Sequence, residues 1–536
     1  MKRLALLLVS LAACSPPGVR SESAAQQTTP TTATTPPATT EPLPPETTQR
    51  PPITIPFLPT EPSLPTEPSL TTEPSPPAEP TEPDEPDEGD ATTSTEVAAG
   101  DQETIGDSLF PELGTDDLDV QSYDVRLRYD QETRLIDGAV TVSAMTIGSV
   151  DRLVLDAKGL DVEAVTVDAV TSDFALVGDE LAITLPADVP AGAPVAIDVT
   201  YSAEAASMSS PDQDEGWFAT SQGSYVINEP DGARTWLPSN DHPSDKATWR
   251  FELTVPTGTT AVANGALVDE RSRPDGDTFV WEQLQPMATY LVQILTGDYE
   301  VLDRGVVGGV AIVDVALAED VERMAPYFAL TDDQLAFFEP LFGPFPLDRY
   351  GLAFADSFPG LAMETQGRSL FSRDDFPGGE PGQIEHLLLS HELAHQWFGD
   401  AVTPADWSDL WLNESFATYG QWLWLDHTGL IPIEAQADTN LAFRQDFPGS
   451  TGEPTLDDLF GYERYDGGAV VLHALRLEIG DDEFFTLLQR WVAENNGTSR
   501  RTEDFIALAN EVAGRDLTAF FDTWLFATDI PDQYPG

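Results

Sequence analysis

The segment that most constrains this chain is His391-Glu-Leu-Ala-His395, in which two histidines stand four residues apart. Apolar residues at helical spacing predict a helix over residues 383 to 400. On such a helix, positions 391 and 395 lie one turn apart on the same face, so two imidazoles point toward one place. A catalytic zinc ion takes three protein ligands and keeps its fourth position for water. The segment therefore predicts a zinc site, with one ion per chain.

The third ligand is expected to be Glu414, which follows His395 after eighteen intervening residues. Two His and one Glu form an established catalytic zinc set. The three-histidine zincin pattern is excluded, because Phe398 and Ala401 occupy its Gly and His positions. Glu392 projects beside the metal, where a general base for the bound water belongs. The alternative is a structural helix with two satisfied histidines, but chance HExxH segments are rare in a chain with only six His.

The net charge of the chain restricts which kinds of molecule it can bind. The chain has 26 Lys and Arg against 92 Asp and Glu, a formal net charge of −66. Such a surface repels nucleic acid and anionic lipid headgroups, so no nucleic-acid partner is expected. We interpret the acidity as a solvated surface; the alternative is an acidic docking function.

The N-terminus has the features of an export signal. Met1-Lys2-Arg3 precedes an apolar run that ends at Ala13 and is too short to span a bilayer as a mature helix. Leu11-Ala-Ala-Cys14 resembles a bacterial lipobox, in which the Cys becomes the lipidated first residue. Residues 1–14 are therefore predicted to be a lipoprotein signal peptide, with a plain secretory signal as the alternative. We expect an extracytoplasmic protein, held at the bacterial cell membrane only by a lipid on Cys14.

Residues 15–107 are rich in Thr, Pro, Glu and Ser and offer little to bury. The tetrapeptide Thr-Glu-Pro-Ser recurs at positions 60, 66 and 72. Such a composition cannot offset the entropy of folding. A disordered or polyproline-like tether is expected here.

The rest of the chain divides into two parts. Residues 117–308 alternate apolar and polar side chains between turn signals, which predicts an antiparallel β domain. From residue 309 to 536 the pattern lengthens to helical segments, and the zinc motif lies among them. The predicted helices include 318 to 341, 383 to 400, 405 to 427, 467 to 479, 482 to 495 and 502 to 513. The expected fold class is α+β multidomain.

Five segments, in order, resemble one family. Trp411-Leu-Asn-Glu-Ser-Phe-Ala417 is similar to the WLNEGFA segment of the aminopeptidase N family of gluzincins. The other four are Asn228 to Ala247 (EPxxARxxFPCxDxPxxKA in the family), Phe358 to Thr365 (GAMEN), Tyr465 to Leu472 (YxKGxxVL) and Phe520 to Phe526 (the closing helix). The likeness covers roughly residues 117 to 536 and is to a short form of the family. It implies a thermolysin-like catalytic domain with C-terminal helices after the β domain.

The resemblance also implies catalytic roles. A phenol hydroxyl beside the metal stabilises the oxyanion of a tetrahedral intermediate, and the family likeness assigns this role to Tyr465. Tyr462 is the competing choice. Glu392 would take a proton from water and deliver it to the leaving amine.

The substrate contacts implied by the resemblance define an exopeptidase. Glu364 and Glu229 would hold the free α-ammonium of a peptide at the end of the cleft. The backbone of Leu361, Ala362 and Met363 would pair with the peptide as an added strand. Peptides with a free N-terminus are therefore the expected substrates.

Three positions depart from the family pattern. Leu361 stands where the family has Gly, Thr365 where it has Asn, and Gly467 where it has Lys. Loss of the Asn side chain is expected to loosen the turn that presents Glu364, and Leu361 to narrow the subsite beside the metal. These changes bear on substrate preference and rate more than on activity.

The sequence thus predicts a zinc-dependent aminopeptidase that hydrolyses the N-terminal residue from peptides. The alternatives are an endopeptidase or an epoxide hydrolase on the same scaffold, and a catalytically silent surface binding protein. An intact Glu392 argues against the silent protein, since a binding scaffold needs no water-activating carboxylate.

Overall fold

Alternating burial builds the first half of the chain as strands. The computed structural model describes residues 104–209 and 214–536; the predicted signal peptide, Cys14 and nearly all of the predicted tether lie outside these ranges. In β1 (Leu118–Asp130) and β2 (Leu135–Thr146), every second side chain faces the core over most of the strand. This period of two fixes which face of the sheet is buried.

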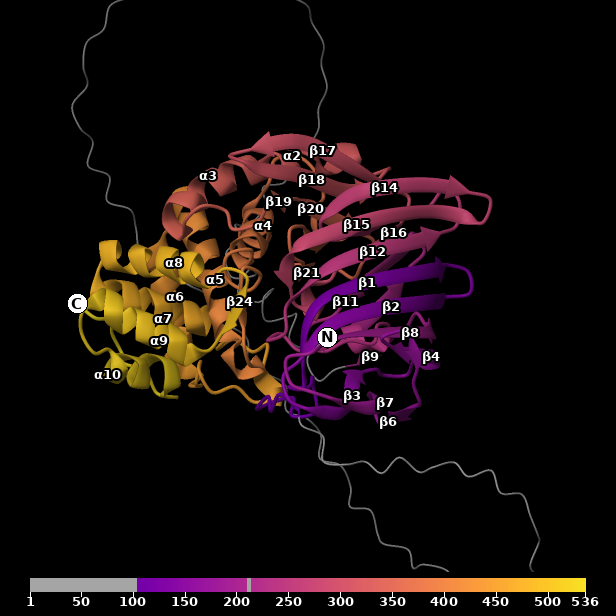
Figure 1. Ribbon diagram of the computed structural model, residues 1–536. Helices are drawn as coiled ribbons and strands as arrows, with labels where there is room; N and C mark the ends of the chain where they lie inside the picture. Colours follow the sequence, from indigo (N-terminus) through magenta and orange to yellow (C-terminus); the bar gives the residue numbers. More distant parts are fainter. Residues whose placement is uncertain (1–103, 210–213) are drawn as a thin grey trace, which may run out of the picture. The chain divides into compact units, whose positions relative to one another are not determined.

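The largest sheet has eight strands in the order β14-β15-β12-β1-β2-β8-β4-β5 (Figure 1). Its further strands are β4 (Asp161–Val167), β5 (Val170–Thr171), β8 (Pro194–Glu204), β12 (Ala247–Val255), β14 (Ala266–Arg273) and β15 (Gly276–Met287). All neighbours are antiparallel except β1 and β12, which pair in parallel.

Two smaller antiparallel sheets complete the β domain. One has the order β13-β16-β11-β10-β9 and the other β3-β7-β6. Their strands are β3 (Val150–Asp156), β6 (Phe174–Val177), β7 (Glu180–Val189), β9 (Ser207–Ser209), β10 (Asp214–Ala219), β11 (Gly223–Ile227), β13 (Thr260–Ala263) and β16 (Ile294–Gly297), with 3₁₀ turns η1 (Ala233–Thr235) and η2 (Thr289–Leu291). Buried tryptophans such as Trp217, Trp249 and Trp281 fill the core they share with the large sheet. The predicted N-terminal β domain is present, but it is not wholly antiparallel, because β1 and β12 pair in parallel.

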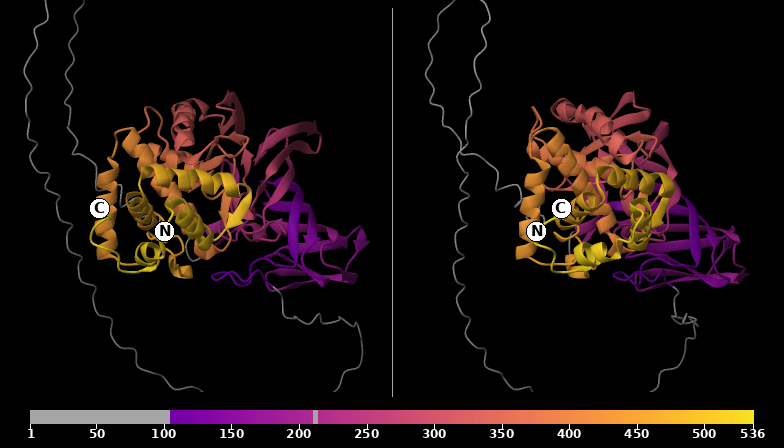
Figure 2. Two further views of the ribbon diagram at one scale, coloured as in Figure 1. Left: turned by 60° about the vertical axis from the view of Figure 1, so that its left-hand side comes forward. Right: turned by 90° about the vertical axis from the view of Figure 1, so that its left-hand side faces the viewer.

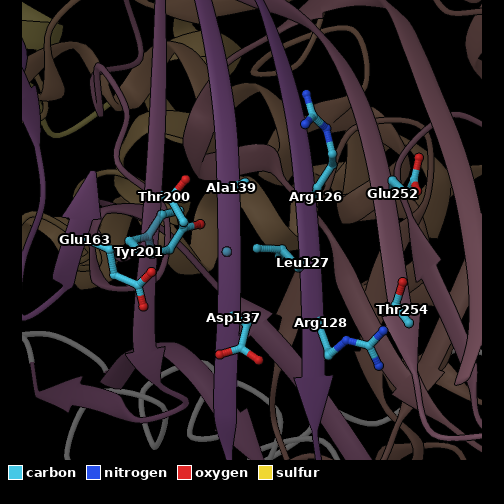
Figure 3. Close-up of a pocket in the computed structure, with 11 residues that line it drawn as sticks. Arg126, Leu127, Arg128, Asp137, Ala139, Glu163, Thr200, Tyr201, Glu252 and Thr254 are labelled. Atoms are coloured by element: carbon cyan, nitrogen blue, oxygen red, sulfur yellow. The ribbon is translucent and has the colours of Figure 1, made fainter. Parts of the chain in front are cut away.

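The polar face of the eight-stranded sheet carries matched charges (Figure 3). Arg126 pairs with Asp124 at 3.0 Å and Arg128 with Asp275 at 3.2 Å, and all four side chains are exposed to solvent. Exposed pairs of this kind contribute only about 0–1 kcal/mol each. The face is therefore a solvated surface rather than a basic patch.

A six-stranded mixed sheet begins the second part of the chain. It runs β17-β18-β20-β22-β21, with β19 beside β18. The strands are β17 (Tyr299–Val307), β18 (Val310–Leu317), β19 (Arg349–Tyr350), β20 (Leu352–Ala355), β21 (Ala362–Met363) and β22 (Ser369–Ser372). The predicted boundary at residue 308 falls in the turn between β17 and β18, so this sheet starts earlier, at Tyr299.

Helices dominate from residue 321 onward and gather together in each view of Figures 1 and 2. They are α2 (Val321–Phe328), α3 (Leu330–Phe342), α4 (Gln383–His395), α5 (Trp411–His427), α6 (Ile433–Asp446), α7 (Asp466–Ile479), α8 (Asp481–Asn495), α9 (Thr502–Ala513) and α10 (Thr518–Phe521), followed by a π-helical turn η6 (Asp522–Phe526). Short elements between them are η3 (Arg373–Asp375), β23 (Val402–Pro404), η4 (Trp407–Asp409), η5 (Leu456–Asp458) and β24 (Thr498–Arg500). Within the described ranges, no helix combines the length and apolar character needed to cross a bilayer.

Most of the predicted helices are present, with three changes of bounds and one additional helix. The segment predicted over 318 to 341 is two helices, α2 and α3, and α5 begins at Trp411 rather than at residue 405, after the turn η4. Helix α4 ends at His395 instead of residue 400. Helix α6 was not predicted, because few of its side chains are buried and its polar sequence has weak periodicity.

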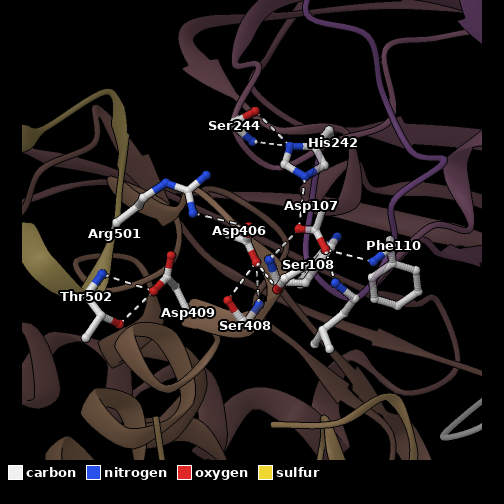
Figure 4. A network of polar contacts seen from close by, with 12 residues as sticks. Asp107, Ser108, Phe110, His242, Ser244, Asp406, Ser408, Asp409, Arg501 and Thr502 are labelled. Carbon is white, nitrogen blue, oxygen red and sulfur yellow. Dashed lines mark hydrogen bonds and ion pairs between the residues drawn. The ribbon is translucent and has the colours of Figure 1, made fainter. Parts of the chain in front are cut away.

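The first described residues form contacts with both the β domain and the helical second part of the chain (Figure 4). Thr104 forms a β-bridge with Thr115. The fully buried Asp107 carboxylate contacts His242 Nε2 at 3.1 Å and accepts a hydrogen bond from Trp407 N at 2.7 Å. The predicted tether boundary at 107 is therefore too late: the fold includes Asp107, because its carboxylate joins the β domain to the segment before α5.

Replacing Asp107 by Ala is expected to lower the free energy of unfolding by on the order of 3 kcal/mol, since His242 and Trp407 N lose a buried partner. Burial alone would raise the pKa of Asp107, but hydrogen bonds with His242, Trp407 N and Phe110 N lower it. The ionised form therefore stabilises the fold above the unfolded pKa of about 3.9, and this contribution is lost as pH falls through the folded pKa. Urea unfolding at neutral pH checks the effect, with the exposed Asp116→Ala as control. Equal losses in the two variants would contradict it.

Candidate active site

Helices α4 and α5 bring three donor atoms together. His391 Nε2 and His395 Nε2 lie 3.0 Å apart, as expected for residues one turn apart on α4. Glu414, in the first turn of α5, places Oε2 3.2 Å from His391 Nε2 and 3.4 Å from His395 Nε2. The helices approach closely because Gly420 has no side chain: a Cβ there would lie 2.8 Å from that of Ala394.

The chemistry of these donors fits zinc. The amide nitrogen of Asn413 donates to Glu364, so its oxygen faces His395 Nδ1, at 2.7 Å. Because an amide oxygen only accepts, Nδ1 carries the proton and Nε2 keeps its lone pair for a metal. Two imidazole nitrogens and one carboxylate oxygen are a zinc donor set. The hydrogen bond to Asn413 fixes the orientation of the His395 ring, as is usual for histidines that bind a metal.

Electrostatics in the site favour a cation. Burial would raise the pKa of Glu414, but His395 and His391 lower it to about 2, so the carboxylate is ionised. Burial lowers the pKa of His391, which favours the neutral ligand form. Burial also opposes a charge on His395, yet Glu364 and Glu414 raise its pKa well above the usual value. Without a metal ion, a protonated His395 balances the charge of these carboxylates. A bound metal ion would supply this positive charge instead.

Glu392 lies beside the donor atoms, as predicted for a base. It is buried, and its Oε2 has no hydrogen-bond partner among residues 104–209 and 214–536. Single donor atoms of Glu392, Glu364 and His395 lie within 4.8 Å of one another. Burial raises the pKa of Glu392, against the positive charge of His395.

Asn413 is a site residue that the sequence reasoning missed. It joins the ligand His395 to Glu364 through the two ends of one amide, at 2.7 and 3.0 Å. Gly399 makes room for it, because a Cβ there would lie 1.9 Å from Asn413 Oδ1. The available signal was its position directly before Glu414 within the Trp411 to Ala417 segment.

The two predicted amine-binding carboxylates come from different parts of the fold. Glu229 follows β11 of the β domain, and Glu364 follows β21 of the six-stranded sheet. Both are buried, and each places one oxygen within 4.8 Å of the other and of Glu414. Burial, Glu364 and Glu414 raise the pKa of Glu229. Such crowding favours a cation between the carboxylates.

The turn that presents Glu364 is firmly held, although Thr365 replaces the family's Asn. Thr365 Oγ1 donates to Arg368 O at 2.5 Å and accepts from Gln293 Nε2 at 2.8 Å. Gln396 Nε2 donates to Glu364 O at 2.8 Å. The loosening expected from the loss of Asn is therefore wrong, because the threonine hydroxyl closes the turn itself.

The predicted peptide-binding backbone lies on an edge strand. Among the described strands, β21 pairs only with β22, with Ala362 opposite Phe371 and Met363 opposite Leu370. Leu361 O accepts from Ser372 N at 2.9 Å, so this carbonyl is turned toward β22. In antiparallel pairing, alternate residues direct their backbone groups to opposite sides. Ala362 is therefore the residue that offers its backbone at the free edge.

The structure favours Tyr465 over Tyr462 for the position beside the metal ligands. The Tyr465 ring stacks near His391, with centroids 6.1 Å apart. Tyr462 instead donates its hydroxyl hydrogen bond to Asn440 O at 2.9 Å. Burial and the carboxylates around the site, Glu414 foremost, raise the pKa of Tyr465, so its hydroxyl keeps the proton that it needs to donate.

Comparison with known proteins agrees with this architecture. The Peptidase M1 N-terminal domain matches residues 120–291, and the Peptidase family M1 domain matches residues 328–524. An M1 zinc metallopeptidase from Deinococcus radiodurans superimposes with a TM-score of 0.74 at 30% identity, over 81% of this chain and 100% of that one. Its structural series includes a mutant bound to the substrate Tyr-Ser-Ala.

Curated relatives are longer proteins. Aminopeptidase M1-D of Oryza sativa subsp. japonica is 28% identical over 316 residues, 54% of this chain and 36% of that protein. Aminopeptidase N of Streptomyces lividans is 28% identical over 339 residues, 57% of this chain and 38% of that protein. The matched region thus spans less than half the length of either.

A β domain, a mainly helical second part and a two-His, one-Glu donor set define a zinc metallopeptidase. The order of these parts and the matches to both domains identify the family. The chain belongs to peptidase family M1.

Replacing Asn413 by Ala is expected to weaken zinc binding by about 10–100-fold, because His395 loses the partner that fixes its ring. Zinc affinity measured by competition with a chelator checks this without any substrate. Asn496→Ala, at an exposed position, is the matched control and should bind zinc like the wild type. Unchanged affinity in Asn413→Ala would refute the positioning role.

Proposed function

We propose that this protein is a zinc-dependent aminopeptidase that removes the N-terminal residue of peptides. One observation carries the proposal: Glu229 and Glu364 meet beside the zinc ligand Glu414, in a buried site whose three oxygens lie within 4.8 Å. Carboxylates so crowded bind a cation strongly where water is excluded. Next to a hydrolytic centre, the natural cation is the α-ammonium of a substrate.

Each side chain then has a defined part in the reaction. Bound zinc supplies Lewis acidity, which polarises a carbonyl and makes water more acidic. Glu392 takes the proton of the attacking water and returns it to the leaving amine nitrogen. Tyr465 donates a hydrogen bond to the oxyanion. Ala362 pairs with the peptide backbone at the free edge of β21.

The relatives support the substrate class. A mutant of the Deinococcus radiodurans enzyme is described with the substrate Tyr-Ser-Ala, and a mutant two-domain M1 zinc metallopeptidase, 30% identical to this chain, with L-tryptophan and with L-arginine. Several curated relatives are named aminopeptidases. Peptides with a free amino end are therefore the substrates proposed for this chain, and a carboxylate pair has no evident purpose in an endopeptidase or an epoxide hydrolase.

The decisive experiment compares aminoacyl-arylamides that carry a free or an acetylated α-amine. The free form should be hydrolysed and the acetylated form should not. Glu364→Gln should raise KM by about tenfold, because removing one charge from the ammonium site costs about 1.4 kcal/mol of binding. Glu392→Gln is the matched control and should instead lower kcat by about 10²–10⁴-fold. Equal cleavage of both substrates would show an endopeptidase, and zinc binding without hydrolysis a silent protein.

We also propose that the enzyme is extracytoplasmic and anchored in the bacterial membrane through a lipid on Cys14. The charged and apolar residues 1–14 and the Pro- and Thr-rich stretch that follows support this location. Cys14→Ser should move the protein from the membrane fraction of cells to another fraction, because a lipid chain cannot be added. Retention of this variant on membranes would argue against the lipid anchor.

A further inference from the structure

A buried ion pair lies next to Tyr465 and takes no part in the reaction described so far. The side chain of Glu463 is packed between two glycines of separate segments. A Cβ on Gly449 would lie 2.7 Å from Glu463 Cγ, and a Cβ on Gly467 would lie 2.6 Å from Glu463 Oε2. Neither glycine is in the left-handed region, so space rather than backbone conformation excludes a side chain. Both glycines thus serve to admit this carboxylate.

Arg444 of α6 completes the arrangement. Its Nε lies 2.9 Å from Glu463 Oε2 in an ion pair, and its side chain is fully buried. Its Nη1 donates to Gly467 O at 3.1 Å and its Nη2 to Gly449 O at 3.2 Å. One guanidinium therefore joins the carboxylate to the backbone of both glycines, a fork that an ammonium group cannot reproduce.

The residues that make these contacts lie on both sides of Tyr465 in the sequence. Glu463 stands two residues before it and Gly467 two residues after it, at the start of α7. Between them, Arg464 O accepts from Ser415 Oγ at 2.6 Å, and Ser415 directly follows Glu414. The backbone on either side of Tyr465 is thus fixed to α6 and to the helix that carries a metal ligand.

We propose that Arg444 and Glu463 are positioning residues that set the place of the Tyr465 hydroxyl relative to the metal ligands. The inference rests on the proposed function, in which this hydroxyl donates to the oxyanion. It also accounts for Gly467, since a side chain there would displace Glu463 from Arg444.

The first test is a double-mutant cycle. Arg444→Lys keeps the charge but cannot bridge both glycine carbonyls, and Glu463→Gln keeps the shape but removes the charge. Each should lower kcat on a free aminoacyl-arylamide by about tenfold with KM within about twofold, because a misplaced donor acts on the transition state. In a Tyr465→Phe background neither should lower kcat further. The surface variant Glu494→Gln, which breaks the exposed Arg490 pair, is the control and should leave both constants unchanged.

Equal losses of kcat with and without the Tyr465 hydroxyl would overturn the proposal, as would a rise in KM alone. If Arg444→Lys fails to fold, the Glu463→Gln cycle decides in the same way. If the wild-type protein hydrolyses no aminoacyl substrate, the proposed function fails and the positioning role is judged by crystallography. The Glu463→Gln structure should then show a displaced Tyr465 ring with His391 and Glu414 in place, and an unmoved ring would refute the proposal.

Discussion

The structure depends on four carboxylates buried around two imidazoles. Glu229, Glu364, Glu392 and Glu414 are each nearly inaccessible to solvent, and burial, followed by repulsion from neighbouring carboxylates, raises the pKa of Glu229 and of Glu392. Burying four carboxylates close together is costly, because each loses its hydration and repels the others. A divalent metal and a substrate ammonium relieve this repulsion, so the same crowding that destabilises the empty site strengthens binding of both.

Such a site requires rigid packing of the helices around it, and glycines allow these helices to approach closely. Gly420 lets α5 approach α4, and Gly399 leaves room for the Asn413 amide that spans His395 and Glu364. At Gly468 a Cβ would lie 1.6 Å from Ser415 Oγ, so α7 also packs directly on α5. Each contact would be lost to a single methyl group, and each fixes a helix that carries a site residue. The catalytic spacing is therefore determined by backbone approach as much as by the polar residues themselves.

The metal ligands could be predicted from the sequence, but most of the residues that hold them in place could not. His391, His395 and Glu414 were predictable because a helical period and a known ligand set both constrain them, and the structure brings them together. Asp107 and the Arg444–Glu463 pair were not, because nothing in their local sequence indicates which residues they contact, and Asn413 was overlooked although it directly precedes Glu414. The same limit explains the domain boundary: the β17–β18 hairpin ends at Leu317 and joins a sheet whose other strands lie within residues 349–372, which no local pattern reveals.

The scarcity of positive charge gives the buried arginines a particular weight. Within residues 104–209 and 214–536, three arginines are almost fully buried, and each donates to at least two backbone carbonyls. Arg368 binds Val313 O and Ala263 O, Arg444 binds Gly449 O and Gly467 O, and Arg464 binds Ser450 O, Thr451 O and Asp458 O. A planar guanidinium carries five donors and can join separate backbone segments, although Arg444 Nε and Arg464 Nε have no hydrogen-bond partner among the described residues. These arginines therefore order backbone segments near the site, as Arg444 does at Gly467, two residues after Tyr465.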